Sequence, residues 1–476
     1  MSDKEIRQIL LKLKTLEEEN EKLKDENAYL KFKLDELQSK RYKSKKTKPP
    51  DDTPTAPITP KKRGGLFGHI GWFRKKPKTI SRIEEVRLDK CPSCGSSSLS
   101  ECEHIEEHVQ EDITLPTTET VLYKHHHYYC KNCKKVVAAI GDGELPKSYI
   151  GPKAKSLAAF LKYVIKVSDR DIRIIFRKVF NMDIAVSTIT GFKGQIKIRA
   201  LSIYKQLLEE LKKGPFIHGD ETGWKLDGIS YWLWKLSNKR IAYSHIDKSR
   251  GQKVIEEILG KSYDGVLISD FLSAYNKITT KGKQRCLVHL FRDLKKVIEY
   301  WHDDKEVLRY CKRLKKMLED AIALYREYQN KEWDEKYYTR RAQLKDALKD
   351  FSFPNPNKRI LKRFANRLAR HKDEILTFLY IKGIDPHNNH AEQQIRPDVI
   401  FRKITFGNRS VKGAENHSVL MTILQTAKLN DMDPIATLEN ILLSKKNPFS
   451  KILSPPEKEK APVSQNYPGA LAYSPI

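Results

Sequence analysis

Long hydrophobic runs are missing from this chain of 476 residues. No stretch reaches the roughly 20 consecutive apolar residues that a bilayer-spanning helix needs. The first residues, MSDKE, do not have the basic and apolar regions of a secretory signal peptide. We therefore expect a cytoplasmic protein without a membrane partner, long enough for two or more domains.

Cysteine is scarce as well, with seven in the whole chain. Thiols stay reduced in the cytoplasm, so these cysteines do not predict a disulfide framework. They are expected to be free thiols or metal ligands, and their spacing decides between the two.

Acidic residues are too few to balance the basic ones. The chain has 61 Asp and Glu against 90 Lys and Arg, which gives a formal net charge of +29. Such an excess attracts phosphates over long distances and indicates a nucleic-acid partner.

Two segments have the composition of irregular chain. Basic runs at 43–48, 61–63 and 74–76 lie in a stretch that also contains proline and glycine. We interpret 41–80 as a basic flexible linker that also contacts DNA phosphates. The end of the chain, 431–476, is expected to hold a C-terminal helix and then a disordered tail rich in Pro, Lys and Ser.

Three carboxylates stand in distinctive sequence settings. Asp220 lies in the motif HGDETGW, Asp270 follows the apolar run VLIS, and Glu392 lies in NNHAEQQ. Two aspartates at strand ends and one glutamate on a helix are able to hold two divalent metal ions, which can drive phosphodiester chemistry. These three are the candidate catalytic residues and Mg²⁺ ligands.

The segments around the first two acids have the patterns of strands. Strands are predicted at 215–220, 229–236, 240–245 and 266–268, with a hairpin at Asp227-Gly228 and a helix at 249–259 that ends at Gly260. A meander followed by a crossover places the first and fourth strands side by side, with Asp220 and Asp270 at neighbouring strand ends. This is the layout of the ribonuclease H-like fold, so we predict an α/β catalytic domain at 213–430.

Glu392 is expected on a helix, because the two asparagines at 388–389 are helix-start signals. Apolar residues and Arg396 follow at helical spacing, although Pro397 is able to kink or end this helix. One face would direct Glu392 to the metals and Arg396 to a phosphate. The long gap before Glu392 is rich in Lys, Arg, Glu and Leu, and it predicts a helical insertion at about 299–380.

Other residues near the acids have competing interpretations. Glu221 is an alternative ligand to Asp220, but neighbouring strand residues point to opposite faces of a sheet, so only one of them faces the metals. His289 follows Cys286 by three residues, and a structural role for this pair is favoured over metal binding or catalysis. His218 either contacts substrate or packs beside the site.

The first 40 residues carry a separate pattern. Ile or Leu recurs every seven residues from Ile9 to Leu37, and a companion seam three residues ahead includes Asn20 and Asn27. This heptad repeat predicts a coiled coil at 1–40, and the asparagines favour a parallel dimer. The alternative is a single amphipathic helix packed on its own protein, but the charged remaining positions argue against it.

Two Cys-x-x-Cys pairs predict a zinc-binding module at 81–145. Four thiolates at these spacings can complete a tetrahedron around Zn²⁺, with each pair on a hairpin. Cys102, His104 and the histidines at 125–127 compete as ligands. The four favoured ligands are Cys91, Cys94, Cys130 and Cys133.

The stretch 150–212 has helical periodicity. Ser168 is predicted to cap a helix at 169–179, and Ser187 to cap another at 188–200. Helix, short turn and helix resemble a helix-turn-helix that binds DNA, although a plain helical hairpin has the same pattern. The candidate groove-facing residues are Ser187, Thr188, Thr190 and Lys193.

These motifs as a set resemble the bacterial transposases of the insertion-sequence-66 family, which are of the DDE type. The resemblance rests on HGDETGW, SD with YN, RCLVHL, NNHAE, and the FRKI and GNRS segments after the third acid. It covers nearly the whole chain. One position departs from the family, which commonly has Arg after the glutamate where this chain has Gln393, so a phosphate contact is not carried over to that position.

The resemblance implies a cut-and-join transposase that acts on insertion-sequence ends and target DNA, in the nucleoid, with companion proteins of the same element. Two Mg²⁺ ions held by Asp220, Asp270 and Glu392 would activate water to cut a strand, and the resulting 3′ hydroxyl would attack target DNA without a covalent protein intermediate. The candidate phosphate contacts are Arg396, Arg402, Lys403, Arg409 and Lys412.

Two rival functions share some of these features. A structure-selective nuclease on the same fold would cut DNA without joining it, but it has no need of a zipper, a zinc module and a helix-turn-helix. A non-catalytic DNA-binding regulator would use those modules, but it has no need of all three acids.

Overall fold

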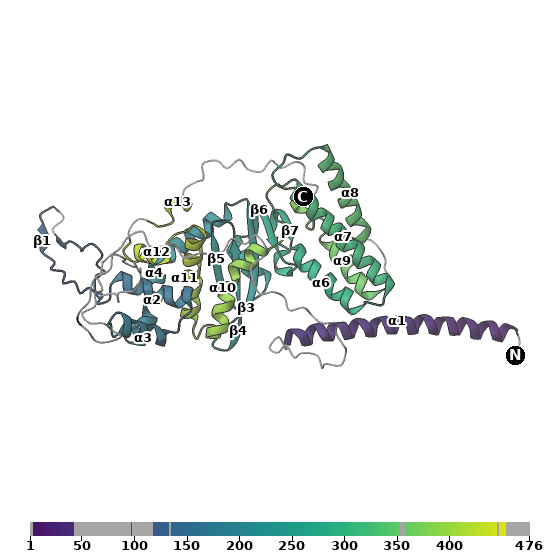
Figure 1. Ribbon diagram of the computed structural model, residues 1–476, viewed down its shortest axis with the longest axis horizontal. Helices are drawn as coiled ribbons and strands as arrows, with labels where there is room; N and C mark the ends of the chain where they lie inside the picture. Colours follow the sequence, from purple (N-terminus) through teal and green to yellow (C-terminus); the bar gives the residue numbers. More distant parts are fainter. Residues whose placement is uncertain are drawn as a thin grey trace. The chain divides into compact units, whose positions relative to one another are not determined.

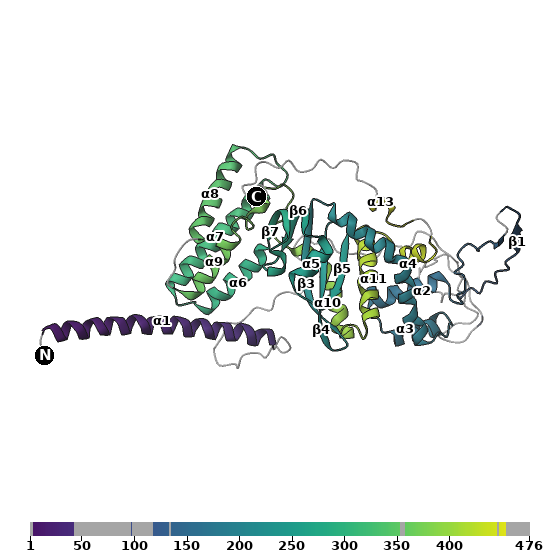
Figure 2. The same cartoon turned by 180° about the vertical axis from the view of Figure 1, so that it is seen from behind.

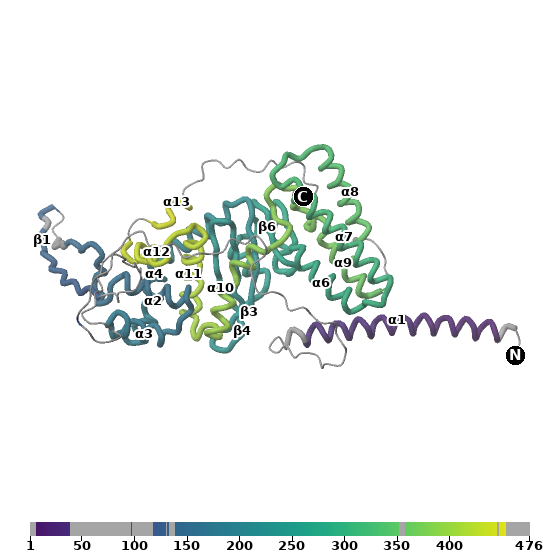
Figure 3. The backbone as a smooth tube through the Cα atoms, viewed as in Figure 1, coloured from purple at the N-terminus to yellow at the C-terminus, as the bar shows by residue number. Residues whose placement is uncertain are grey.

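The structure is a computed structural model that describes residues 3–41, 97, 118–132, 135–352, 358–444 and 447–453. The chain divides into two units, one formed by Met1–Glu36 with Leu115–Ile476 and the other by Leu37–Thr114. Nearly all of the described residues belong to the first unit (Figures 1 and 3). None of the described helices is long and apolar enough to cross a membrane.

A five-stranded mixed sheet forms the centre of the first unit (Figure 1). Its strands are β3 (Phe216–Leu226), β4 (Ile229–Ser237), β5 (Ala242–Asp247), β6 (Ser262–Ser269) and β7 (Thr279–Arg285). They lie in the order β5-β4-β3-β6-β7. β3, β4 and β5 pair antiparallel, whereas β6 pairs parallel with both β3 and β7. The prediction that the first and fourth strands lie side by side is therefore confirmed.

Two details of the predicted strands are wrong. β3 does not end at Asp220 but continues to Leu226, because its pairing with β4 runs as far as the Leu226–Ile229 pair. The strand β7 was not expected at all, because its sequence TTKGKQR has no apolar alternation. The hairpin at Asp227-Gly228 is confirmed, and both residues have the positive φ that this two-residue turn requires.

Helices cover both faces of the sheet. α5 (Gln252–Leu259) lies on one face (Figure 2), and α10 (Asn389–Thr405) and α11 (Val411–Leu429) lie on the other (Figure 1). α5 begins three residues later than predicted and ends at Gly260, as expected. α10 passes through Pro397 and continues to Thr405, so this proline does not end the helix.

A helical region lies between β7 and α10, as predicted for 299–380. Its helices are α6 (Leu287–Tyr300), α7 (Lys305–Glu327), α8 (Glu335–Ser352), α9 (Arg359–Arg370) and the short η3 (Thr377–Leu379). Their apolar faces share one core with Val266 and Ile268 of β6. The insertion is therefore packed directly against the sheet.

The C-terminal part of α1 (Asp3–Arg41) packs on this helical region. Phe32 is 5% exposed and packs edge-on against Tyr300 and at a tilt against Trp301, with ring centroids 5.1 and 4.8 Å away. The Ile and Leu side chains of the heptad seam, from Ile6 to Leu37, are exposed. Within the described chain this apolar seam is not covered by protein.

The remaining described elements precede β3, follow α11 or, in the case of η2, lie between β6 and β7. They are β1 (His127–Cys130), β2 (Lys135–Ala138), α2 (Pro152–Phe160), η1 (Leu161–Ile165), α3 (Asp169–Val179), α4 (Val186–Lys212), η2 (Ser273–Tyr275), α12 (Pro434–Leu442) and α13 (Ser450–Leu453). The predicted cap is confirmed at Ser168, whose hydroxyl accepts a hydrogen bond from the Asp171 amide. The cap at Ser187 is wrong, because α4 begins at Val186, two residues earlier than predicted, with Ala185 as its cap, and it runs without a break to Lys212. The tail after Leu453 lies outside the described residues.

A buried ionic group joins α10 to the sheet. Lys235 of β4 and Asp398 of α10 are both fully buried, and their Nζ and Oδ2 atoms lie 2.9 Å apart. His417 of α11 bonds the other oxygen of Asp398 at 2.9 Å, and Gln425 bonds both partners. Burial alone would raise the pKa of Asp398, but Lys235 and His417 hold it at about 2. The pair therefore stays ionised and fixes the helix that carries Glu392.

Replacing Lys235 by Met should destabilise the protein by about 3–5 kcal/mol, because Asp398 would remain buried without its cation. Urea unfolding monitored by circular dichroism measures this change. Lys239→Met, at an exposed position two residues after β4 ends, should change the free energy of unfolding by less than about 0.5 kcal/mol. Equal effects of the two variants would contradict this account.

Candidate active site

Asp220 and Asp270 come from adjacent parallel strands in matching positions. The ladder pairs Phe216 with Val266 and His218 with Ile268, an offset of 50 residues (266 − 216). The same offset relates Asp270 to Asp220 (270 − 220 = 50). β6 ends at Ser269 while β3 continues, so the two acids lie where the two strands part. They lie two residues beyond the last ladder pair, His218 with Ile268, and the charge of Asp270 contributes to the raised pKa of Asp220.

Asp220 and Glu221 face opposite sides of the sheet. Asp220 pairs with Lys235, whose side chain reaches Asp398 on α10. Glu221 pairs with Trp234 and contacts the α5 side, where Arg250 donates to its Oε1 at 2.7 Å and Tyr275 to its Oε2 at 3.3 Å. Asp220 therefore shares its face with α10, and Glu221 does not.

Asn388 fixes the start of the helix that carries Glu392. This buried side chain donates to the carbonyl oxygen of Gly219 at 2.7 Å and bonds Nδ1 of His218 at 3.1 Å. Its backbone amide donates to Sγ of Cys286 at 3.1 Å. One residue thus ties α10 to β3 beside Asp220 and to the start of α6. His218 packs against this junction, and burial lowers its pKa to about 4.

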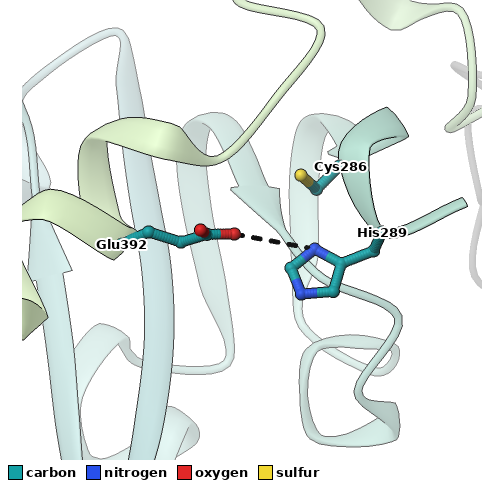
Figure 4. A group of neighbouring side chains, drawn as sticks. All are labelled: Cys286, His289 and Glu392. Atoms are coloured by element: carbon teal, nitrogen blue, oxygen red, sulfur yellow. Dashed lines mark ion pairs between the residues drawn. The ribbon is translucent and has the colours of Figure 1, made fainter. Parts of the chain in front are cut away.

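Glu392 lies one turn into α10, and like Asp220 and Asp270 it is partly exposed, with 37% of its side chain accessible. Its Oε1 atom lies 3.9 Å from Nδ1 of His289, and neither atom has a hydrogen-bond partner among the described residues (Figure 4). Cys286 lies beside these two side chains, and it comes from the start of α6, as His289 does (Figure 4). Cys286, His289 and Glu392 each offer a possible metal-ligand atom, and these atoms lie within 4.8 Å of one another. Asp220 and Asp270 do not belong to such a cluster among the described residues.

Negative charge accumulates around Asp220. Burial raises the pKa of Asp220 to about 8, and the nearby carboxylates of Glu221, Asp270 and Glu392 add to this effect. Burial and Asp270 likewise raise the pKa of Glu221 to about 7, against the opposing effect of Arg250. Such a group of carboxylates favours a cation, which would relieve the repulsion.

Arg285 holds the backbone of Asp270 in place through a hydrogen bond, and the sequence did not indicate this role. This arginine is fully buried at the end of β7, and it donates to the Asp270 carbonyl oxygen at 2.7 Å and to Asn276 at 2.7 Å. Glu374 accepts from its Nε at 2.6 Å. Arg285 stands in the RCLVHL segment, but arginines are mostly exposed, so nothing in the sequence indicated that this one is buried.

The predicted DNA-contact residues fall into two groups. Arg396, Lys403, Arg409 and Lys412 are exposed, whereas Arg402 bonds to the Thr222 hydroxyl at 3.2 Å and to the Gly223 carbonyl oxygen. In α4, Ser187 and Thr188 are exposed. Thr190 and Lys193 bond to Asp169 at 2.8 and 2.6 Å. Arg402, Thr190 and Lys193 therefore have partners within the protein.

Most of the predicted zinc ligands lie outside the described residues, namely Cys91, Cys94 and Cys133. Cys130 ends β1, which pairs antiparallel with β2, so the predicted hairpin is confirmed at this position. His125 bonds to Ala139 and Glu144 at 2.8 and 3.0 Å. Zinc binding itself stays a prediction.

Asp220→Asn should stabilise the metal-free protein at pH 8 and above. The folded-state pKa of Asp220, about 8, lies above its unfolded value of about 4, so its stabilising contribution is complete below pH 4 and is lost as the pH rises through 8. The amide carries no such cost. Thermal unfolding in chelator should show a midpoint about 2–4 °C higher for each kcal/mol relieved, with the gain shrinking toward pH 4. A pH-independent difference would contradict the raised pKa.

Comparison with known proteins agrees with the motifs. The model of the Transposase IS66 family matches residues 147–416, which include the whole sheet, the helical region and all three acids. A protein of Sinorhizobium fredii named "Uncharacterized protein y4hP" is 21% identical over 391 residues, which are 74% of this chain and 70% of that protein. Because the family model covers more than half of the chain, this protein belongs to the IS66 family of transposases.

Proposed function

We propose that this transposase cuts and joins DNA strands at the ends of an insertion sequence, with Asp220, Asp270 and Glu392 as ligands of two Mg²⁺ ions. The observation that supports this most is the matching position of the two aspartates: Asp220 lies in β3 on the face that α10 covers, and Asp270 directly follows β6 at the same offset of 50 residues as the ladder pairs. The strand order β5-β4-β3-β6-β7, with its antiparallel and parallel halves, supports the proposal, because it is the order expected of a ribonuclease H-like fold.

The donor set suits magnesium. Carboxylate oxygens are the ligands that Mg²⁺ prefers, and Asp220 is buried among like charges that a cation would neutralise. Glu392 Oε1 is buried and has no hydrogen-bond partner, as expected for an oxygen reserved for a ligand. In a two-metal site the outer ligands need not touch, because the ions themselves are about 3.5–4 Å apart.

Each part of the site would have a defined role. When bound, the two ions would activate the attacking water or 3′ hydroxyl and neutralise the leaving oxygen. Asp220 would be the central ligand, since the carboxylates of both Asp270 and Glu392 contribute to its raised pKa. Asn388 and Arg285 would act as positioning residues, because they hold the backbone of Gly219 and Asp270 rather than contacting DNA.

The exposed surface of α10 and the turn after it would receive the DNA backbone. Lys403 and Arg409 are exposed there, together with the apolar side chains of Ile404 and Phe406. Phe406 is 76% exposed and held at a positive φ of 60°, on a turn that Asn408 anchors to β3. Cations for phosphates beside an aromatic ring for a base are the combination that single-stranded DNA binding uses.

The N-terminal segments would serve end recognition. The zinc module, with Cys91, Cys94, Cys130 and Cys133 as its ligands, and the exposed start of α4 would contact the element ends, and α1 would pair two copies of the chain. A dimer suits a reaction that must process two DNA ends. A nuclease without joining activity is the rival on the same site, and a strand-transfer assay separates the two.

Asp220→Ala, Asp270→Ala and Glu392→Ala should each reduce Mg²⁺-dependent cutting and joining of a labelled terminal-repeat duplex by at least ~10³-fold. Binding of the same duplex, measured by gel shift, should change little, because end recognition is assigned to other segments. Glu221→Gln is the matched control and should cost much less, since Glu221 bonds Arg250 on the opposite face.

An inactive Glu221→Gln together with an active Glu392→Ala would refute the assignment of the third ligand. Cutting without any joined product in the unaltered protein would favour the nuclease instead.

A peptide of residues 1–40 should form a parallel helical dimer, because the described part of the chain leaves its seam of Ile and Leu exposed and a second copy offers a matching seam. Sedimentation equilibrium gives the mass, and circular dichroism gives the helicity. Leu16→Glu with Leu23→Glu should abolish the dimer, whereas the exposed charge change Lys14→Glu should not. A monomeric peptide would remove the dimer proposal.

A further inference from the structure

Cys286, His289 and Glu392 bring three different metal-binding atoms to one place (Figure 4). Sγ of Cys286, a ring nitrogen of His289 and an oxygen of Glu392 all lie within 4.8 Å of one another. Cys286 is the N-terminal cap of α6 and His289 lies in the first turn, so the Cys-x-x-His spacing directs both side chains to the same end of the helix. The third ligand comes from α10, which Asn388 holds against this point.

We propose that Cys286, His289 and Glu392 bind a borderline divalent metal ion such as Zn²⁺ or Co²⁺, and that this ion competes with Mg²⁺ for Glu392. The binding part stands on the trio alone. The competition part rests on the proposed function, because it requires Glu392 to be a Mg²⁺ ligand.

The chemistry of the three atoms selects the ion. A thiolate and an imidazole are poor ligands for Mg²⁺, which prefers oxygen, but they suit Zn²⁺ and Co²⁺. Three protein ligands leave a fourth position open, as in reactive rather than closed zinc sites. The ligand atoms of a tetrahedral zinc site lie roughly 3.5 Å apart, so small side-chain rotations would complete the geometry.

Access and charge also suit a metal. The side chains of His289 and Glu392 are 31% and 37% exposed, which gives an ion a route from solvent, while Cys286 is fully buried behind them. His289 Nδ1 and Glu392 Oε1 are both without a hydrogen-bond partner and lie 3.9 Å apart, too far to bond each other. Burial raises the pKa of Cys286, and the backbone amides of Asn388, His289 and Val288 that point to Sγ oppose this effect only in part, so a bound metal ion would be needed to stabilise the thiolate.

Occupation of this site would draw one oxygen of Glu392 toward α6. Glu392 would then be shared between a tightly held transition metal and the Mg²⁺ pair next to Asp220. Traces of Zn²⁺ would therefore reduce strand cutting without affecting DNA binding, and excess Mg²⁺ would restore it only in part.

The test is Co²⁺ binding to the full-length protein, followed by the thiolate-to-cobalt charge-transfer band in the near ultraviolet. The band is expected in the unaltered protein. In Cys286→Ser its intensity at saturating Co²⁺ should fall by the amount that one bound ion contributes. Cys311→Ser is the matched control, because Cys311 is equally buried but lies in the core of α7. Comparison of these variants cancels any cobalt bound by the N-terminal cysteines.

Identical titrations of Cys286→Ser, His289→Ala and the unaltered protein would overturn the site. If Cys286→Ser fails to fold, His289→Ala decides, since a partly exposed side chain can be shortened with little loss of stability. If His289 and Glu392 only bond each other and bind no metal, the Co²⁺ titrations of the variants and the unaltered protein should likewise be identical.

Competition is tested by Zn²⁺ inhibition of Mg²⁺-dependent cutting, with each variant compared with its own rate in Mg²⁺ alone. The Zn²⁺ concentration for half inhibition should rise at least ~10-fold in Cys286→Ser and stay unchanged in Cys311→Ser. Equal inhibition of all variants would overturn the competition. A cobalt band that depends on Cys286, together with full cutting by Glu392→Gln, would instead leave the site standing and refute the proposed function.

Discussion

The arrangement of the candidate site depends on the hydrogen bonds of one buried side chain, Asn388. Its amide group bonds the Gly219 carbonyl oxygen and His218 on β3, and its backbone amide bonds Cys286 at the start of α6. Three elements that are remote in sequence thereby meet where β3 and β6 part. An unsatisfied amide at this depth would cost about 1–3 kcal/mol, so the three elements are bound to a single geometry. The acids on β3 and α10 inherit their separation from this junction.

The same region concentrates charge in a way that stability alone would not favour. Asp220 and Glu221 lie in consecutive positions, and burial together with nearby carboxylates raises the pKa of both. Arg250 is paired with Glu221 on the far face, and Lys235 is paired with Asp398. Among the described residues, no ion pair joins Asp220 to a cation. A carboxylate with a raised pKa and no ion-pair partner is typical of a site that binds metal or acts in catalysis.

The acids and their order were predictable from the sequence because each lies in an element with a strong local signal. VLIS is a buried strand, the turn at Asp227-Gly228 closes a hairpin, and the asparagines before Glu392 start a helix. The length of β3 was not predictable, since polar residues beyond Asp220 are held by β4 rather than by their own pattern. The same holds for β7, whose sequence is polar but whose place is set by β6. Cys286 and His289 were seen as a pair, but their contact with Glu392 spans more than 100 positions and is a property of the packed chain.

The long helical insertion between the second and third acids does not disturb the site because its two ends meet. The backbone amide of Leu287 donates to the Pro386 carbonyl oxygen at 3.0 Å, and that of Asn388 donates to Cys286 across 102 positions of sequence. The chain enters and leaves the insertion at neighbouring positions. Its helices can therefore form a separate core against β6, while the distance from the end of β7 to the start of α10 stays short. Loop-closure entropy grows only slowly with length, so a long excursion costs little more than a short one once its ends are bonded. The third acid is therefore remote in sequence and local in structure, and the residues that close the insertion are the ones that place Glu392.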